Sequence, residues 1–323
     1  MLIKFICKLL APVIYATSLF AQTVPTNTYP NKPVRFVLSF PGGAPDILAR
    51  LIAPKLTEIW GQQVLIDPRS GAGGILGTDA VAKAPPDGYT YLIASPSHAI
   101  NPSLYSKLPY DSIADFAPVS QLVEVPNIVI INPNVPARSV KELIAYAKAN
   151  PGKLYYGTSC CGSSQHLAAE LFAKMASIKI VHVPYKAAPA VVIDLIAGQV
   201  QLTFGSSAAL PNVRTGKLVA LAVTTARRIS SLPDLPTVAE AGLPGYEASA
   251  WYAMFAPART PRLSVEKVQV DLARVLKMPD IYEKLAPLAI EPIGSKPAEL
   301  ESFLKREIAK WSVVVKESGA TAE

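Results

Sequence analysis

Histidine and cysteine are scarce in this chain, which has 323 residues and only three of each. His98, His166 and His182 and the cysteines have none of the spacings that hold zinc or related metals, so the sequence predicts no metal site. There is no G-x-S-x-G motif, and each histidine needs a serine and an acid brought to it by the fold before it resembles a hydrolase triad. The sequence therefore predicts a protein that is not an enzyme.

Charged residues are also few, at 17% of the chain, and the net charge is +7. Two of the basic residues lie near the N-terminus, and the others are scattered among acids instead of forming a Lys/Arg run with interleaved aromatics. We therefore expect no nucleic-acid partner. A mildly basic surface does suit an anionic ligand.

The N-terminus has the layout of a secretory signal peptide. Lys4 and Lys8 precede an apolar stretch at 9–20, and small residues follow around Ser18 and Ala21, the two candidate cleavage points. Cys7 comes too early for the cleavage site of a lipoprotein, and no later stretch is long and apolar enough to span a bilayer. We expect residues 1–21 to be removed and the mature protein to be soluble and periplasmic.

Two cysteines remain in the mature chain, Cys160 and Cys161, and they are adjacent. In an oxidising compartment such a pair can close a strained vicinal disulfide, or the two thiols can pack unpaired in a loop, and both forms stay open. Neither form can staple distant parts of the fold together.

Half of the residues are hydrophobic, which at this length predicts a large core and more than one α/β unit. The apolar run Val34–Phe40 ends at Pro41-Gly42-Gly43, where apolar residues begin to recur at helical spacing. Further strands are expected at Val64–Ile66, which leads to a helix holding Val81, and at Tyr89–Ala94, followed by two extended segments at Val119–Val123 and Ile128–Ile131. Such alternation is typical of a parallel sheet covered by helices.

A second alternating series begins after residue 125, with a helix capped by Ser139. Its expected strands and helices are Leu154–Tyr156, Ser164–Met175, Ile180–Val183, Pro189–Ala197, Val200–Phe204 and Leu218–Val223. The last part of the chain contains a strand-like segment, Ala248–Ala256, and helices at 264–276 and 297–316. Their apolar faces must pack against something, and we expect them to pack against the first series. We expect a discontinuous lobe 1 (residues 22–124 and 250–323), a lobe 2 (residues 125–249), and crossings near Glu124 and Ala250.

Two loops have the physical character of an anion site, because each joins a strand end to a helix N-terminus. In the loop at 41–46, Gly43 allows close backbone approach and Pro45 suits a first helical turn, although an ordinary turn with Asp46 stabilising its own helix explains the same residues. The loop at 156–166 holds more hydroxyl side chains than one helix cap requires. The run at 71–77 lacks the spacing of a dinucleotide-binding loop, so no cofactor is expected.

Short motifs follow one another along nearly the whole mature chain. They are Tyr29–Pro33; Phe40–Gly43 with Asp46 and Ala49-Arg50; Gly71–Gly74; Pro86–Thr90; Tyr156–Ser159 with Gly162-Ser163 and His166-Leu167; His182–Lys186; Leu221–Thr224; Leu232–Thr237; and Pro244–Glu247 with Trp251. Any one of them is weak, but in this order they resemble the extracytoplasmic receptors of tripartite tricarboxylate transporters, the Bug-type family.

The resemblance implies an α/β type 2 periplasmic-binding-protein fold, in which two lobes with parallel-rich sheets close over a ligand about a two-crossing hinge. It implies that amides and hydroxyls hold a small organic acid, which the protein delivers to membrane permease subunits. We expect the protein to be a monomer. By position, the implied ligand-binding residues are Gly43, Ala44, Pro45, Asp46, Ser95 and Ser97 in lobe 1 and Ser159, Cys160, Gly162, Ser163, Ala187, Ala188, Gly205 and Ser206 in lobe 2. Asp194 is interpreted as a support for the turn that precedes its helix.

The chain departs from the family pattern at Cys160-Cys161, where a glycine and a variable residue are usual, and at Ala187, where glycine usually follows Tyr-Lys. Both departures lie in or next to the expected pocket and can reshape it toward a bulkier or more apolar ligand. A dicarboxylate, an amino acid, an aromatic acid and an uncharged amide all stay open. So do two other functions, a secreted hydrolase or transferase using Ser163 or His166, which needs a carboxylate near His166, and a ligand-sensing adaptor on the same fold.

Overall fold

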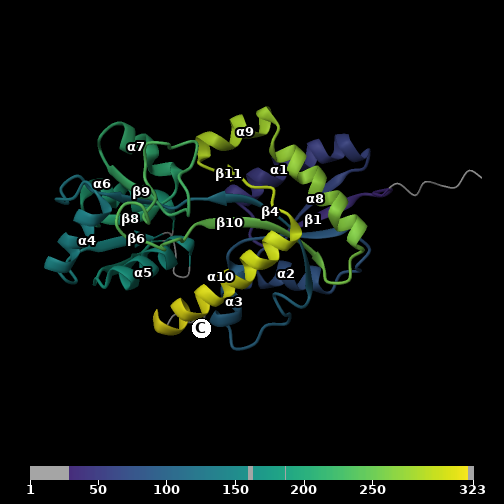
Figure 1. The fold of residues 1–323 in the computed structure, drawn as a ribbon, viewed down its shortest axis with the longest axis horizontal. Helices are drawn as coiled ribbons and strands as arrows, with labels where there is room; N and C mark the ends of the chain where they lie inside the picture. The colour runs from purple at the N-terminus through teal and green to yellow at the C-terminus, as the bar shows by residue number, and fades with distance from the viewer. Residues whose placement is uncertain (1–28, 159–162, 186, 319–323) are drawn as a thin grey trace, which may run out of the picture.

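The computed structural model describes residues 29–158, 163–185 and 187–318, which form two mixed β-sheets with helices on their faces (Figure 1). The sheet built from the middle of the chain lies on the left of the view. The sheet built from the two outer parts of the chain lies at the centre and right. The predicted α/β class is confirmed.

The first sheet has the strand order β11-β4-β10-β3-β1-β2 among the described residues. Its strands are β1 (Val34–Leu38), β2 (Val64–Pro68), β3 (Thr90–Ala94), β4 (Phe116–Val125), β10 (Ala250–Pro257) and β11 (Glu291–Pro292). β1 lies between β2 and β3 and is parallel to both, whereas β10 is antiparallel to β3 and β4. The carboxyl ends of β1 and β3 therefore lie at the same edge of this sheet.

Helices from both outer parts of the chain cover the first sheet. They are α1 (Ala44–Trp60), α2 (Ile75–Ala82), α3 (Ser97–Leu104), α8 (Arg262–Leu276), α9 (Pro279–Leu285) and α10 (Pro297–Ser318), with the short 3₁₀ turns η1 (Ala72–Gly74) and η3 (Ala286–Leu288). Leu48, Ile52 and Leu56 recur every fourth residue of α1, so they share one face, and all three are fully buried in one core with Val268 and Leu272 of α8.

The second sheet has the order β7-β6-β8-β5-β9 among the described residues. Its elements are α4 (Val140–Ala149), α5 (Ser164–Ala176), α6 (Ala188–Ala197), η2 (Ser207–Ala209) and α7 (Leu210–Arg214), with strands β5 (Ile128–Ile131), β6 (Tyr155–Thr158), β7 (Val181–Pro184), β8 (Leu202–Gly205) and β9 (Val219–Val223). β6 is parallel to β7 and β8 on its two sides, so three carboxyl ends lie together, while β5 is antiparallel to β8 and β9.

The chain crosses between the sheets twice, from β4 to β5 and again on its way from β9 to β10. The crossings are tied together at Asn127, whose backbone N–H donates to Thr224 Oγ1 (2.9 Å) and whose side-chain amide donates to the Ala248 carbonyl oxygen (3.0 Å). The Thr224 N–H donates in turn to the Asn127 carbonyl oxygen (2.9 Å). The division into lobes at residues 22–124, 125–249 and 250–323 stays a prediction.

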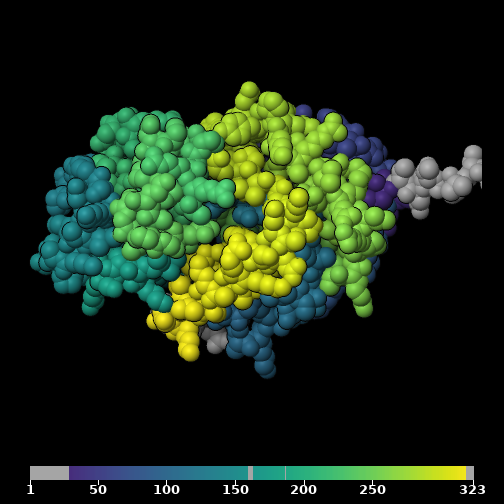
Figure 2. Space-filling model, in the orientation of Figure 1, coloured from purple at the N-terminus to yellow at the C-terminus, as the bar shows by residue number. Residues whose placement is uncertain are grey.

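The two sheet regions also touch away from the crossings. Ser230, after β9, donates to the Glu291 carboxylate of β11 (2.9 Å) and lies 2.8 Å from the Tyr282 hydroxyl of α9. In the space-filling view the green residues of the second sheet region reach the yellow residues of the C-terminal part (Figure 2). The two regions therefore share an interface on this face of the molecule.

Four elements, α3, α7, α9 and β11, are not predicted from the sequence. Pro102 lies inside α3, and Pro211 and Pro279 lie in the first turns of α7 and α9. Proline interrupts an expected helical pattern, yet it fits a first turn because its missing N–H has no partner there. Within the described ranges, no helix combines the length and apolarity needed to cross a membrane.

Candidate functional site

The first group of predicted site residues lies where β1 and β3 end. Ser95 follows β3, and its Oγ lies 2.9 Å from Ser97 Oγ at the start of α3. Gly74 and Ser39, which were not predicted as site residues, lie next to them, since a Cβ at Gly74 would lie 3.2 Å from Ser97 Oγ and 3.6 Å from Ser39 Cβ. Ser39 and Ser95 are buried, so these hydroxyls form part of a packed sheet edge.

The loop from β1 to α1 adds Gly43, Ala44, Pro45 and Asp46 to the same edge. Gly42 and Gly43 have φ values of +93° and +63°, and a Cβ at either would meet nothing within 4 Å. Because these glycines are open, a ligand can approach the backbone closely there. The Asp46 carboxylate instead accepts from Arg50 Nε one helical turn on (2.8 Å), which agrees with the alternative role of stabilising its own helix. We use the name first edge for the following residues: Gly43, Ala44, Pro45 and Asp46 of this loop, together with Ser39, Gly74, Ser95 and Ser97.

The second group lies where β6, β7 and β8 end. Ser163 caps α5, its Oγ accepting from the His166 N–H (3.2 Å). Ala187 precedes α6, Ala188 and Pro189 form its first turn, and Gly205 ends β8 before Ser206. The predicted residues Ser159, Cys160 and Gly162, and with them Cys161, lie outside the described residues. We call the described members, Ser163, Ala187, Ala188, Gly205 and Ser206, the second edge.

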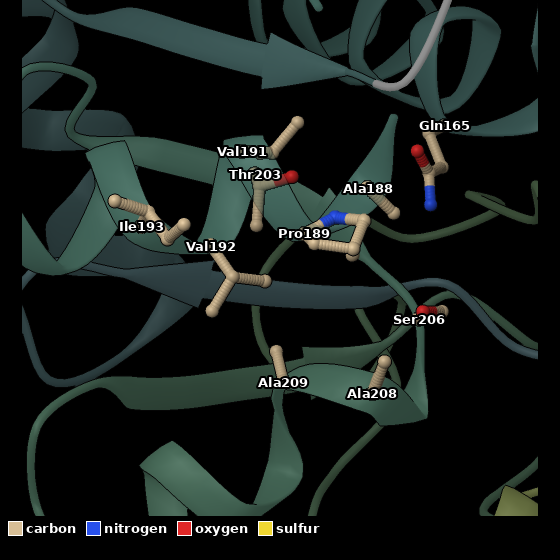
Figure 3. Close-up of a pocket in the computed structure, with 11 residues that line it drawn as sticks. Gln165, Ala188, Pro189, Val191, Val192, Ile193, Thr203, Ser206, Ala208 and Ala209 are labelled. Atoms are coloured by element: carbon tan, nitrogen blue, oxygen red, sulfur yellow. The ribbon is translucent and has the colours of Figure 1, made fainter. Parts of the chain in front are cut away.

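A cavity of about 240 Å³ opens at the second edge and is lined by its residues Ala188, Gly205 and Ser206 (Figure 3). Its other lining residues are Gln165, Pro189, Val191, Val192, Ile193, Thr203, Ala208 and Ala209. Gln165 belongs to the predicted loop at 156–166 and Pro189 to the turn before the expected helix at 189–197; the other lining residues were not singled out from the sequence. The signal that points to them is the composition of α6, which is apolar nearly all round, because a helix that faces water on one side is normally polar there.

Contacts beneath α6 fix its position against β6. A Cβ at Gly157 would lie 2.8 Å from Val191 Cγ1 and 3.2 Å from Tyr185 Cε2, so only glycine lets the helix approach so closely. The Tyr185 hydroxyl donates to Asp194 (2.7 Å), and burial together with this carboxylate raises the pKa of Tyr185 to about 12. Asp194 therefore supports the turn before α6, as interpreted from the sequence.

His166 and His182 stack beside α5 with ring centroids 4.1 Å apart, and Tyr156 stacks on His182 at 5.0 Å. Thr158 Oγ1 lies 2.7 Å from His182 Nε2. Burial, followed by the neighbouring His166, lowers the pKa of His182 to about 4, and burial also lowers the pKa of His166. Both rings are therefore neutral at neutral pH.

A carboxylate does lie near His166, as a hydrolase would require. Glu170 Oε1 is 3.8 Å from His166 Nε2, but the same oxygen also accepts a hydrogen bond from Tyr156. Ser163, the serine that would be the nucleophile, serves as a helix cap. Across the described part of the chain, no three His, Cys, Asp or Glu side chains are grouped so that they could hold a metal ion.

Residues 48–320 of this chain match the family described as the tripartite tricarboxylate transporter family receptor. Protein BugT of Bordetella pertussis is 36% identical over 312 residues, which cover 95% of this chain and 96% of BugT. A structure of an R. palustris protein with adipate is 40% identical with a TM-score of 0.74, covering 90% of this chain and 98% of its own. The structure of MatC from Rhodopseudomonas palustris with bound malate is 31% identical with a TM-score of 0.70, covering 89% and 100%. These likenesses confirm the predicted solute-binding-protein fold.

Proposed function

The chain belongs to the tripartite tricarboxylate transporter receptor family, and from this membership we propose that it holds a small carboxylate between its two sheet regions and delivers it to a tripartite membrane transporter. A receptor of this family binds its ligand and is not an enzyme, which agrees with the scarcity of catalytic motifs. The observation that supports a carboxylate ligand is that two related structures hold adipate and malate.

The two edges are the surfaces proposed to hold the acid. Each combines strand ends with a helix N-terminus, where backbone N–H groups and the helix dipole favour a negative charge. The first edge contributes the open backbone of Gly43 and the hydroxyls of Ser95 and Ser97, and the second contributes Ser163 and Ser206. Such donors hold a carboxylate without a cationic side chain, and closure of the two regions about Asn127 and Thr224 would surround it.

The proposed site of action is the periplasm, after removal of residues 1–21, because the family is one of extracytoplasmic receptors. The proposed partner is a set of membrane subunits. The receptor would bind them as a monomer that is closed over its ligand. Uptake of acid by vesicles that contain those subunits should depend on added receptor. If uptake does not depend on it, the sensing adaptor is the better description.

Calorimetric titration of the mature protein with adipate, malate and other small acids tests the binding itself. We expect saturable binding, and we expect the acid to be recovered unchanged after incubation. An acid that is consumed, or a complete lack of binding across the acids, would contradict the proposed function.

Three serine variants test whether both edges take part. Ser97→Ala and Ser206→Ala should each weaken acid binding about tenfold, because a hydrogen bond to a charged group contributes about 1.5–3 kcal/mol. Ser302→Ala is the matched control, since the exposed Ser302 hydroxyl only donates to the Ala298 carbonyl oxygen of its own helix. Unchanged affinity in either edge variant would remove that edge from the site.

A further inference from the structure

The cavity beside the second edge is polar at one end and apolar at the other. In Figure 3 Gln165 and Ser206 lie on the right, while Val192 and Ile193 of α6 lie on the left and Val191 lies between them. The polar end adjoins the start of α5, since Gln165 is the second residue of that helix. A molecule that fills the whole cavity therefore meets donors first and hydrocarbon afterwards.

The apolar end offers little to a second polar group. The Thr203 hydroxyl donates to the Gly157 carbonyl oxygen (2.8 Å), so its hydrogen is already used. Among the described residues that line the cavity there is no charged side chain, and Asp194, next to Ile193 in sequence, accepts from Tyr185 instead. A carboxylate pushed into this end would lose its water without gaining donors, which is strongly unfavourable.

The size of the cavity sets the size of the hydrocarbon. An apolar protein cavity of about 150 Å³ is large enough to bind benzene. The cavity here, at about 240 Å³, has room for a ring or a chain of similar bulk together with the carboxylate that anchors it. A small hydroxy acid would leave most of it unfilled.

We propose that the preferred ligand is a monocarboxylate with an apolar body, such as a medium-chain or aromatic acid, whose hydrocarbon lies against Val191, Val192 and Ile193. This inference rests on the proposed function and narrows its substrate class. The carboxylate lies at the Gln165 and Ser206 end, and each methylene that enters the apolar end tightens binding about fourfold. The selection is between acids of equal length, in favour of the one with a single carboxylate.

Titration with pairs of acids of equal length tests this selection. Hexanoate should bind at least tenfold tighter than adipate, and butyrate at least tenfold tighter than succinate. Benzoate should bind at least as tightly as butyrate. If adipate and succinate bind as tightly as their monocarboxylate partners or more tightly, the inference is wrong while the proposed function stands. If none of these acids binds, the proposed function fails with it.

Two isoleucine-to-serine variants locate the hydrocarbon. Ile193 is exposed on α6 and lines the apolar end of the cavity, so Ile193→Ser should remove apolar contact there without disturbing the core. We expect about tenfold weaker hexanoate binding and unchanged propionate binding. Ile196→Ser is the matched control, because Ile196 is also exposed on α6 but does not line the cavity. Equal hexanoate affinity in the two variants, at the same melting temperature, would place the hydrocarbon elsewhere and overturn the inference.

Discussion

Both edges combine strand ends with a helix N-terminus, but the structure that surrounds them differs. At the first edge the Ser95 and Ser97 hydroxyls contact one another, Ser39 and Ser97 leave little room for a side chain at Gly74, and the strands behind them are buried. At the second edge the residues border an open cavity whose wall is the half-exposed, apolar helix α6. The first edge is therefore suited to fixing one end of a ligand, and the second to accommodating ligands of different bulk.

This difference explains how one fold can serve many acids. The hydroxyls and open glycine backbone of the two edges present the same donors to any carboxylate, since they recognise the charged group alone. Selection among acids then falls to the shape and polarity of the cavity at the second edge, where a few side chains on α6 and η2 decide what fits. Substitutions in the second region should alter ligand choice more than substitutions in the first.

Each region contains a histidine with a pKa lowered to about 4, and acid should distinguish the regions most strongly. His98 of α3 is fully buried, with Nε2 donating to the Ser112 carbonyl oxygen (3.0 Å), and burial lowers its pKa. His182 is half-exposed in its ring stack, so solvent screens its contribution. Between about pH 6.5 and pH 4 the unfolded chain binds more protons than the folded protein, so stability falls as pH falls.

Because the pKa of His98 is lower in the folded protein than in the unfolded chain, we expect this residue alone to reduce the free energy of unfolding by about 3 kcal/mol by pH 4. Urea unfolding at pH 7, 5.5 and 4 measures the loss. His98→Gln should remove most of the dependence of stability on pH, and His182→Gln should remove much less of it. The lowered pKa of His166 adds to the pH dependence of the second region but does not change this order. Equal effects from the two variants would mean that the second region is as tightly closed as the first.

Two glycines test the same contrast by steric means. A Cβ at Gly77 would lie 2.8 Å from the Arg69 carbonyl oxygen and 2.8 Å from Ser39 Cα, both backbone atoms, whereas a Cβ at Gly157 meets side chains. Gly77→Ala should therefore destabilise by about 2 kcal/mol and Gly157→Ala by about 1 kcal/mol, because side chains of α6 can shift while backbone cannot. Urea denaturation gives both values, and a larger loss at Gly157 would show that α6 is held more rigidly than the first edge.

Much of the fold can be predicted from the sequence because its signals are local. The spacing of Leu48, Ile52 and Leu56 predicts α1, and Ser139 predicts the start of α4, where its Oγ accepts from the Glu142 N–H (3.1 Å). α3 is not predicted, because Pro102 reads as an interruption although the helix tolerates it in its last turns. The antiparallel direction of β10 also escapes prediction, since it depends on how the chain returns from the second sheet.

The site divides in the same way. Gly43 and Ser163 can be nominated from the sequence because they lie in recognisable motifs, and Ser95 and Ser206 can be nominated by their position relative to the family pattern. The cavity cannot, because Gln165, Val191 and Thr203 come from three elements and meet only through the pairing of β6 with β8, which sets Gly157 opposite Thr203. In the sequence α6 is apolar nearly all round, which indicates that it has no ordinary polar outer face, but only the packed structure shows that part of it faces a cavity.

Two helix caps provide the smallest but most direct test of the second edge. Ser139 and Ser163 make the same bond, each accepting the N–H of the residue three positions on, from Glu142 at 3.1 Å and from His166 at 3.2 Å. Replacing either with alanine removes a cap and should cost about 1 kcal/mol of stability. Only Ser163→Ala should also weaken acid binding, because only Ser163 lies at the second edge. Thermal unfolding and calorimetric titration of both variants separate the two effects, and equal acid affinity in the pair would show that Ser163 is a cap and nothing more.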